Sequence, residues 1–325
     1  MTAFRKALSI DELNLGSPAE LAVTVGNFDG VHRGHEAVLT ELVRVAGESG
    51  RRGVAVTFDP HPLAVVAPGR APRLLAPLDE RLELIAAAGV EDVLVMPFTS
   101  ELASNEGDAF LRSIGVGEGS HVVLGYDFHM GRDRSSGIES LRELGRRVGF
   151  DLDVVPAVLY EGEAVSSSRI RAAISRGDVE EAGRMLGRAY PIRGAVVRGD
   201  GIGGRVLATP TANIETHALK LLPADGVYYV EDCAAGRPGV LYVGRRPTFG
   251  KGERRVEVHL LDVDADLYGT ELAVRVLRRI REDMRFADAA GLGAQISKDI
   301  ESARALATAS EASTDTGSEP CSVKE

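Results

Sequence analysis

A ten-residue run, Gly26-Asn27-Phe28-Asp29-Gly30-Val31-His32-Arg33-Gly34-His35, constrains the fold of this chain more than any other feature. It follows the apolar segment 21–25, which predicts a strand, and it precedes apolar residues at helical spacing, Val38, Leu42 and Val45. Glycines allow a sharp turn and a close approach of the backbone to a ligand. A helix start adds free N–H groups and a positive dipole end, so this turn suits a phosphate.

Two histidines of this run stand three residues apart. If His32 and His35 both lie in the first helical turn, they share one face of the helix. Two imidazoles above a phosphate can donate hydrogen bonds to the charge that develops during phosphoryl or nucleotidyl transfer. The run contains no Gly-Lys-Ser or Gly-Lys-Thr, so it is not a P-loop.

The first half of the chain alternates short apolar segments with helical patterns. We expect strands at 21–25, 54–58, 93–96, 122–124 and 152–155, with helices that include 79–88 and 138–148. Such alternation is typical of βαβ units, so this half is predicted to be a Rossmann-like α/β domain with a parallel sheet. The ten-residue run and the segment Thr57-Phe58-Asp59-Pro60-His61-Pro62 both fall at strand ends, which is consistent with one shared site. His61 is a candidate wall of that site.

The pattern changes in the second half. Strands are expected at 194–197, 226–230, 240–243, 255–261 and 272–277, separated by turns that contain Gly and Pro. This spacing predicts an antiparallel barrel or sandwich. A last helix is expected at 287–307, and the polar segment 308–325 is predicted to be a disordered tail. The predicted domains are therefore 1–186 and 187–307.

Two consecutive helices are predicted to close the first domain. The first begins at the run Ser166-Ser167-Ser168-Arg169-Ile170-Arg171. Its hydroxyls and arginines could hold a triphosphate, although an N-cap with two solvated arginines is the simpler interpretation of this stretch alone. Asp178 and Glu181 predict a capping box at the start of the second helix.

Composition limits the classes of function. The 325 residues suffice for two domains, and a formal net charge of −10 with interleaved charges argues against a nucleic-acid-binding protein. No segment is long and apolar enough to span a bilayer, and the N-terminus lacks the apolar core of a signal peptide. We therefore expect a cytoplasmic protein that acts on small molecules and not at a membrane.

Three further stretches carry groups suited to ligands. Gly125-Tyr126-Asp127-Phe128-His129-Met130-Gly131 follows a predicted strand, with a structural turn as the alternative. The loop Gly199-Asp200-Gly201-Ile202-Gly203-Gly204-Arg205 precedes Pro210-Thr211-Ala212-Asn213, where glycines could cradle phosphate while a hydroxyl and an amide bind Mg²⁺. Glu257 lies between two valines of a strand and points to the opposite face, as a solvated glutamate also would.

Several of these runs resemble motifs of the bacterial bifunctional riboflavin kinase/FAD synthetases. The ten-residue run resembles their His-x-Gly-His motif, which marks the nucleotidyltransferase superfamily, and 166–171 is similar to the accompanying Ser-Ser-Thr-x-x-Arg motif. Pro210-Thr211-Ala212-Asn213 resembles the riboflavin kinase signature. Arg246-Pro247-Thr248-Phe249 and 256–262 resemble later parts of that module. The resemblance covers about residues 15–305.

This resemblance implies an N-terminal nucleotidyltransferase domain that adenylylates FMN to FAD, releasing pyrophosphate, and a C-terminal β-barrel that phosphorylates riboflavin to FMN with Mg²⁺ and ATP. Catalytic roles are implied for His32, His35, Arg171 and Glu257. Contacts with ATP are implied for Gly26, Phe28, Asp29, Gly34, Ser167, Ser168, Gly203, Arg205, Thr211 and Asn213. Thr211 and Asn213 would also bind Mg²⁺, and Asp127, Phe128 and Arg281 would contact the flavin.

Besides Ser168 in place of the Thr of Ser-Ser-Thr-x-x-Arg, the chain departs from the family pattern at three positions. Ala208 and Thr209 replace the Gly and Phe of Leu-Gly-Phe-Pro-Thr-Ala-Asn, and Met130 replaces an aromatic residue. These changes motivate one alternative, a paralogue with an active adenylyltransferase and a weakened or respecialised kinase. A non-catalytic flavin-binding protein is the second alternative. The retained histidines, Arg171 and Glu257 argue against it, because a binder needs no such charge-stabilising set.

Overall fold

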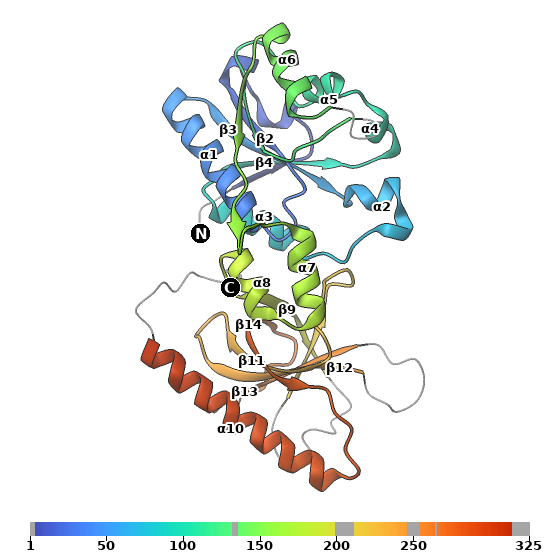
Figure 1. The fold of residues 1–325 in the computed structure, drawn as a ribbon, viewed down its shortest axis with the longest axis vertical. Helices are drawn as coiled ribbons and strands as arrows, with labels where there is room; N and C mark the ends of the chain where they lie inside the picture. Colours follow the sequence, from blue (N-terminus) through green and yellow to red (C-terminus); the bar gives the residue numbers. More distant parts are fainter. Residues whose placement is uncertain (1–3, 132–135, 199–210, 246–253, 264, 314–325) are drawn as a thin grey trace. The chain divides into compact units, whose positions relative to one another are not determined.

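The structure consists of two compact units. The computed structural model describes residues 4–131, 136–198, 211–245, 254–263 and 265–313 (Figure 1). The chain divides into Met1–Ser167 and Ser168–Glu325. The first unit contains a parallel sheet covered by helices and the second a closed antiparallel barrel, so both predicted architectures are confirmed.

A six-stranded parallel sheet forms the centre of the first unit. Its strands are β1 (Arg5–Ala7), β2 (Leu21–Val25), β3 (Arg52–Asp59), β4 (Asp92–Pro97), β5 (His121–Gly125) and β6 (Asp151–Val155). Their order is β1-β4-β3-β2-β5-β6, and neighbouring strands are parallel. Along the chain β2 leads to its neighbour β3, whereas its other neighbour, β5, comes much later. The strand order therefore reverses between β2 and β5, and such switch points bind ligands at the carboxyl ends of strands.

Helices cover both faces of this sheet (Figure 1). On one face lie α1 (Arg33–Ser49) and α3 (Leu78–Ala87), and on the other lie α5 (Gly107–Ser113) and α6 (Ile138–Val148). Successive strand residues point to opposite faces, so Val54 packs with α5 and α6 while Ala55 packs with α1 and α3. The predicted strands and both predicted helices of this unit are present, with ends shifted by at most two residues.

Shorter elements complete the first unit. They are α2 (Pro62–Val66), α4 (Ser100–Ser104), the hairpin of β7 (Leu159–Tyr160) and β8 (Glu163–Ala164), and the 3₁₀ helices Asp11–Leu13, Pro18–Glu20 and Pro68–Arg70. Most of them lie in loops that the sequence patterns left unassigned. They are too short to display a period from which an element could be predicted.

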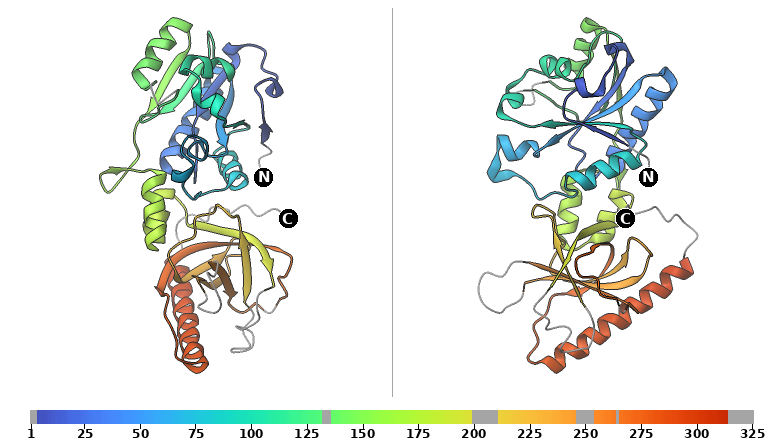
Figure 2. Two further views of the ribbon diagram at one scale, coloured as in Figure 1. Left: turned by 90° about the vertical axis from the view of Figure 1, so that its right-hand side faces the viewer. Right: turned by 180° about the vertical axis from the view of Figure 1, so that it is seen from behind.

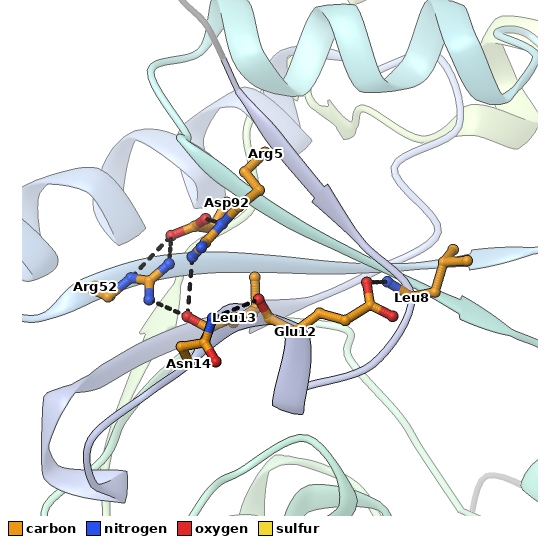
Figure 3. A network of polar contacts seen from close by, with 7 residues as sticks. All are labelled: Arg5, Leu8, Glu12, Leu13, Asn14, Arg52 and Asp92. Carbon is orange, nitrogen blue, oxygen red and sulfur yellow. Dashed lines mark hydrogen bonds and ion pairs between the residues drawn. The ribbon is translucent and has the colours of Figure 1, made fainter.

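The edge strand β1 was not predicted from the sequence. Side-chain contacts hold this three-residue strand against the rest of the sheet. Arg5 Nε donates to one carboxylate oxygen of Asp92 at 2.8 Å, and Arg52 Nη2 donates to the other at 2.5 Å (Figure 3). Both guanidinium groups also donate to the carbonyl oxygen of Leu13. This network fastens the N-terminal segment to the amino ends of β3 and β4.

Two helices, α7 (Ser167–Arg176) and α8 (Val179–Leu186), follow the first unit's sheet. The carboxylate of Asp178 accepts a hydrogen bond from the Glu181 N–H at 3.0 Å, as the predicted cap requires. The reciprocal half of the capping box is replaced by other contacts. The Asp178 N–H donates to the Ala173 carbonyl, and the Glu181 carboxylate accepts from Arg176.

The second unit is built on a closed antiparallel barrel. Its strands are β9 (Tyr190–Val197), β10 (Ala212–Thr216), β11 (Gly226–Asp232), β12 (Pro238–Gly244), β13 (Arg255–Leu260) and β14 (Glu271–Glu282). Their order around the barrel is β10-β13-β12-β11-β14-β9. Of the two predicted architectures, the barrel is the one present. Of the barrel strands described, only β10 was missed, because it is five residues long and its first two residues belong to a run interpreted as a binding motif.

A long helix, α10 (Ala289–Ser313), runs along the outside of the barrel (Figure 2). Ala303 and Ile300 pack there against Tyr229 and Val240. The helix continues six residues beyond the predicted end at Ala307, because 308–313 contain alanine and glutamate, which favour helix. Residues 308–313, which were predicted to be disordered, are therefore helical. Residues 314–325 lie outside the described residues.

The boundary between the compact units falls at Ser167/Ser168, before the predicted end of the first domain at 186. Both intervening helices contact the barrel. Ala224 N–H donates to the Ile174 carbonyl at 3.2 Å, and Arg279 Nη1 donates to the Arg176 carbonyl at 3.3 Å. By packing, α7 and α8 therefore belong to the barrel's unit, whereas the predicted boundary followed the sequence motifs.

Candidate functional site

The ten-residue run forms the loop between β2 and α1, at the point where the strand order reverses. Three of its residues adopt positive φ angles: Phe28 at 47°, Gly30 at 83° and Val31 at 36°. A β-branched residue such as Val31 is strained there, and strain of this kind persists only where the surroundings enforce it. The loop is thus held in one unusual shape at the place where a parallel sheet binds its ligands.

The two histidines of the loop lie face to face. Their ring centroids are 3.6 Å apart and their planes differ by 15°. His32 is the N-cap of α1, and its Nδ1 accepts a hydrogen bond from the His35 N–H at 3.2 Å. Since Nδ1 accepts, neutral His32 carries its proton on Nε2, where it can be donated to a ligand. The predicted common face of the two histidines is therefore present.

Two glycines make room for these rings. A Cβ at Gly34 would lie 3.1 Å from His32 Cε1 and 3.2 Å from His32 Nδ1. A Cβ at Gly26 would lie 2.9 Å from the ring of Phe28, which is buried and meets His35 edge-on at a centroid distance of 5.3 Å. Both glycines are therefore needed for packing inside the loop, whatever contact they make with a nucleotide.

Asp29 is buried, and backbone N–H groups of the protein bind its carboxylate. Its carboxylate oxygens accept from the N–H groups of Leu75 and Ala76 at 3.1 and 2.9 Å. Its backbone carbonyl accepts from the Ser167 hydroxyl at 3.0 Å. The sequence analysis assigned Asp29 to ATP, but the carboxylate is engaged in holding the loop that precedes α3.

The same contact brings two predicted motifs together, because Ser167 is the first residue of α7. Ser168 and Arg171 follow on that helix, within the second compact unit. Ser168 is exposed and Arg171 is half-buried. Their approach to the ATP phosphates stays a prediction.

One buried arginine of this site was missed. Arg81, on α3, is 2% exposed, and its Nη1 donates to the Asn27 carbonyl, the Thr57 hydroxyl and the Phe58 carbonyl at 2.8, 3.2 and 3.1 Å. Burial lowers the pKa of this guanidinium, while the nearby carboxylates oppose the shift. The sequence did hold a signal, since Arg81 lies on the apolar stripe of α3 with Leu78 and Ile85.

The loop after β5 was predicted to contact the flavin. It follows the neighbour of β2, so it lies at the same edge of the sheet as the histidine loop. Asp127 is exposed there, whereas Phe128 packs partly against the core under α5 and α6. Met130 is 8% exposed within that core, so its replacement of an aromatic residue changes core packing. His61 caps α2, with Nδ1 accepting from the Leu63 N–H.

In the barrel, two of the predicted kinase residues fall on one row across neighbouring strands. Asn213 of β10 pairs with Glu257 of β13, which pairs with Tyr242 of β12. Directly paired residues point to the same face of a sheet. That face is the outer one, because Val240, two residues before Tyr242, packs against α10. The backbone register thus places Asn213 and Glu257 side by side.

Tyr242 beside Glu257 was missed by the sequence analysis. Its ring lies over Gly244, where a Cβ would overlap the Tyr242 hydroxyl. Burial, together with the charge and hydrogen bond of Asp283 and the charge of Glu257, raises the pKa of Tyr242 to about 12. A neutral hydroxyl therefore stands next to Glu257 near pH 7. A tyrosine in an alternating strand gives no sequence signal of such a place.

Arg281 lies on the same row, paired through Val227 of β11 with Tyr242. Its guanidinium binds both carboxylate oxygens of Asp299 on α10, with distances of 2.8 to 3.1 Å. The Asp299 side chain is 3% exposed. Arg281 was predicted to contact the flavin. In the structure its side chain instead forms an ion pair that fastens α10 to the barrel.

The remaining predicted residues concern phosphate and metal. Thr211 is half-buried just before β10, two residues from Asn213, and supplies a hydroxyl oxygen beside an amide oxygen. Gly203 and Arg205, like Ala208 and Thr209, lie outside the described residues. Within the described part of the chain, no cluster of three or more His, Cys, Asp or Glu side chains could hold a metal ion. Two oxygen donors fit Mg²⁺ that is bound together with nucleotide phosphates.

No helix among the residues described is long and apolar enough to cross a membrane.

Comparisons with known proteins match both units. The family model for FAD synthetase matches residues 16–169, and that for riboflavin kinase matches residues 186–307. A bifunctional riboflavin kinase/FMN adenylyltransferase from Pseudomonas fluorescens is 39% identical over 88% of this chain and 93% of its own length. The protein of that name from Escherichia coli is 36% identical over 87% and 91%. A crystal structure described as a macrolide-efflux protein from Streptococcus pneumoniae superposes with a TM-score of 0.81 at 31% identity, covering 93% of this chain and 98% of that one.

Proposed function

Because the chain belongs to the bifunctional riboflavin kinase/FMN adenylyltransferase family, we propose that the loop of His32 and His35 and the row of Asn213 and Glu257 are its two reaction centres. The protein phosphorylates riboflavin to FMN with one ATP and joins FMN to the AMP part of a second ATP, giving FAD and pyrophosphate. The observation that carries the residue assignment is the stacked histidine pair at the start of α1.

In adenylyl transfer, an FMN phosphate oxygen attacks the α-phosphorus of ATP. A new P–O bond forms there as the bond to the β-phosphate oxygen breaks, and pyrophosphate leaves. The attacking oxygen is already an anion, so no protein nucleophile or strong base is required. We assign charge neutralisation to the Nε2–H of His32, to His35 and to the N-terminus of α1, with Arg171 and Ser168 as further phosphate contacts.

In the kinase reaction, a ribityl hydroxyl of riboflavin attacks the γ-phosphorus of ATP, and ADP leaves. Glu257 takes the proton of that hydroxyl as the P–O bond forms. Thr211 and Asn213 would hold Mg²⁺, which neutralises phosphate charge when bound. The half-buried position of Glu257 and its pairing with Asn213 support this assignment. Gly203 and Arg205 are proposed to contact the ATP of this site.

Two residues of the loop after β5 are proposed to lie at the flavin. Asp127 is exposed at the edge of the sheet that carries the histidine loop, which favours a contact with FMN. The partly packed ring of Phe128 favours a supporting role. We keep 1–186 and 187–307 as the functional domains, since the motifs of each activity fall within them. Both reactions use cytoplasmic metabolites, so we propose a cytoplasmic enzyme without nucleic-acid partners.

The test is chromatography of products after purified protein is incubated with riboflavin, ATP and Mg²⁺. FMN should appear first and FAD should follow. If riboflavin is not consumed while added FMN becomes FAD, the kinase assignment fails. Excess chelator should stop both steps and added Mg²⁺ should restore them. Turnover that persists in chelator would contradict the metal assignment.

A further inference from the structure

Arg81 is a buried cation whose described partners are all neutral. Its Nη1 binds two carbonyl oxygens and one hydroxyl, and its Nε has no hydrogen-bond partner. Among the described residues no carboxylate lies within ion-pair distance of it. Buried charges are ordinarily paired, because an isolated charge is costly to remove from water. The carboxylates of Asp29 and Asp59 act on Arg81 through their charge without a direct hydrogen bond, so its hydrogen bonds serve to hold the loop and not to pair a charge.

The position of Arg81 is directly behind the histidine loop. The carbonyl of Asn27 accepts from Arg81 Nη1 at 2.8 Å and from the Thr57 hydroxyl at 3.1 Å. Two donors thus draw this carbonyl toward α3 and the carboxyl end of β3. The loop is held again by Asp29, whose carboxylate binds the segment just before α3.

Because the Asn27 carbonyl is held by these two donors, the orientation of the Phe28 N–H group is fixed as well. A trans peptide bond is planar, with its C=O and N–H on opposite sides. With the Asn27 carbonyl turned toward Arg81, the Phe28 N–H points the other way. That N–H donates to no acceptor among the described residues. It precedes the helix whose N-cap is His32, so it adds a donor to those at the helix start.

We infer that Arg81 is a positioning residue of adenylyl transfer: it fixes the Asn27–Phe28 peptide so that the Phe28 N–H meets an ATP phosphate, and it places a positive charge behind that phosphate. The inference rests on the proposed function of the histidine loop. Arg81 does not touch the reacting atoms. It acts through the loop that does.

The experiment compares Arg81→Met with Arg52→Met in the full-length protein. Arg52 is the matched control, because it also lies in the first unit, binds Asp92 and the Leu13 carbonyl, and sits at the opposite end of β3 (Figure 3). Both variants lose structural hydrogen bonds. Measured quantities are the kcat and KM of FAD formation from FMN, the rate of FMN formation from riboflavin, and the thermal unfolding midpoint.

Arg81→Met should lower the kcat of FAD formation about 10- to 100-fold, the usual effect of a group that orients a reacting one. FMN formation should be unchanged. Arg52→Met should lower the unfolding midpoint yet retain the wild-type kcat. Equal kcat values for folded Arg81→Met and wild type would overturn the inference, as would an equal loss in Arg52→Met.

Two milder variants decide the question if Arg81→Met does not fold. Thr57→Val removes one donor to the Asn27 carbonyl, and Arg81→Lys keeps the charge while changing its geometry. Each should lower the kcat of FAD formation by about 3-fold or more, since a carbonyl that loses one donor is less firmly held. Wild-type kcat in both would refute the inference. Absence of FAD formation in wild-type protein would instead refute the proposed function.

Discussion

The imidazole rings of His32 and His35 are stacked with centroids 3.6 Å apart, and the Nδ1 of the first accepts the backbone N–H of the second. The same hydrogen bond caps α1 and fixes the positions of the two histidines, which are the candidate catalytic residues. His32 thus caps the helix that follows the strained loop, and its Nε2 is the atom that we propose binds the nucleotide.

Substitution of either histidine by asparagine should slow FAD formation strongly and spare FMN formation. Asparagine is a favourable N-cap, so His32→Asn keeps the start of α1 while removing the imidazole. We expect each variant to lower the rate of FAD formation about 10²- to 10³-fold, the typical effect of removing one donor to a charged transition state. Rates are measured by chromatography from FMN and from riboflavin. A folded variant that loses both activities would contradict separate sites.

Two glycines of α1 provide a matched pair. Gly34→Ala would bring a Cβ within 3.1 Å of the His32 ring, whereas nothing lies within 4 Å of a Cβ at Gly47. Gly34→Ala should lower FAD formation about 10-fold or more, because small displacements of reacting groups slow catalysis strongly. Gly47→Ala should leave the rate unchanged and stabilise the protein by about 0.5–1 kcal/mol. Equal rates in both variants would show that the ring position is not critical.

Glu257→Gln should have the opposite effect to the histidine variants. Loss of the base should lower FMN formation about 10²- to 10⁴-fold, while added FMN is still converted to FAD. Glu215→Gln is the control, since Glu215 is an exposed glutamate on the adjacent strand β10. It should leave both rates unchanged. If Glu257→Gln keeps wild-type FMN formation, the base must be sought elsewhere.

The raised pKa of Tyr242 predicts a loss of stability at alkaline pH. The unfolded tyrosine loses its proton near pH 10, but burial and Asp283 raise the folded-state pKa to about 12. Between these values the unfolded chain binds fewer protons, so the free energy of unfolding falls as pH rises. Tyr242→Phe should show a smaller fall in this range, measured by denaturant unfolding. Tyr268→Phe, at a 47% exposed position, should follow wild type.

A double-mutant cycle tests whether Arg281 holds α10 or the flavin. Arg281→Met leaves the carboxylate of Asp299 buried without its cation, which should destabilise the protein by about 3–5 kcal/mol. Arg281→Met combined with Asp299→Leu should recover much of that stability, and the KM for riboflavin should be near wild type. A raised KM in a fully stable double variant would instead restore Arg281 to the flavin site.

The sequence predicted the architecture well because both units follow simple periods. Continuously buried strands such as β3, and α6 with its apolar stripe, were placed with ends within two residues. β1 and β10 were missed for a physical reason. They are short, and partners far along the chain, such as Asp92 for Arg5, hold them in place.

The residues in the motifs of the site could be predicted from the sequence, whereas the residues that hold those motifs in place could not. Spacing alone placed His32 and His35 on one face, and alternation placed Glu257 opposite its valines. Arg81 and Tyr242 became visible only in three dimensions, because their roles depend on acceptors from other strands and loops. For Asp29 and Arg281, motif resemblance suggested ligand contacts, whereas their side chains bind protein groups.

The most direct test of two separate reaction centres in one chain is complementation between variants. His32→Asn alone should convert riboflavin only to FMN, and Glu257→Gln alone should leave riboflavin unconverted. Mixed with riboflavin, ATP and Mg²⁺, the two variants should produce FAD, because FMN released by the first is adenylylated by the second. Failure of the folded mixture to form FAD, although each variant retains its single step, would contradict separate centres linked by free FMN.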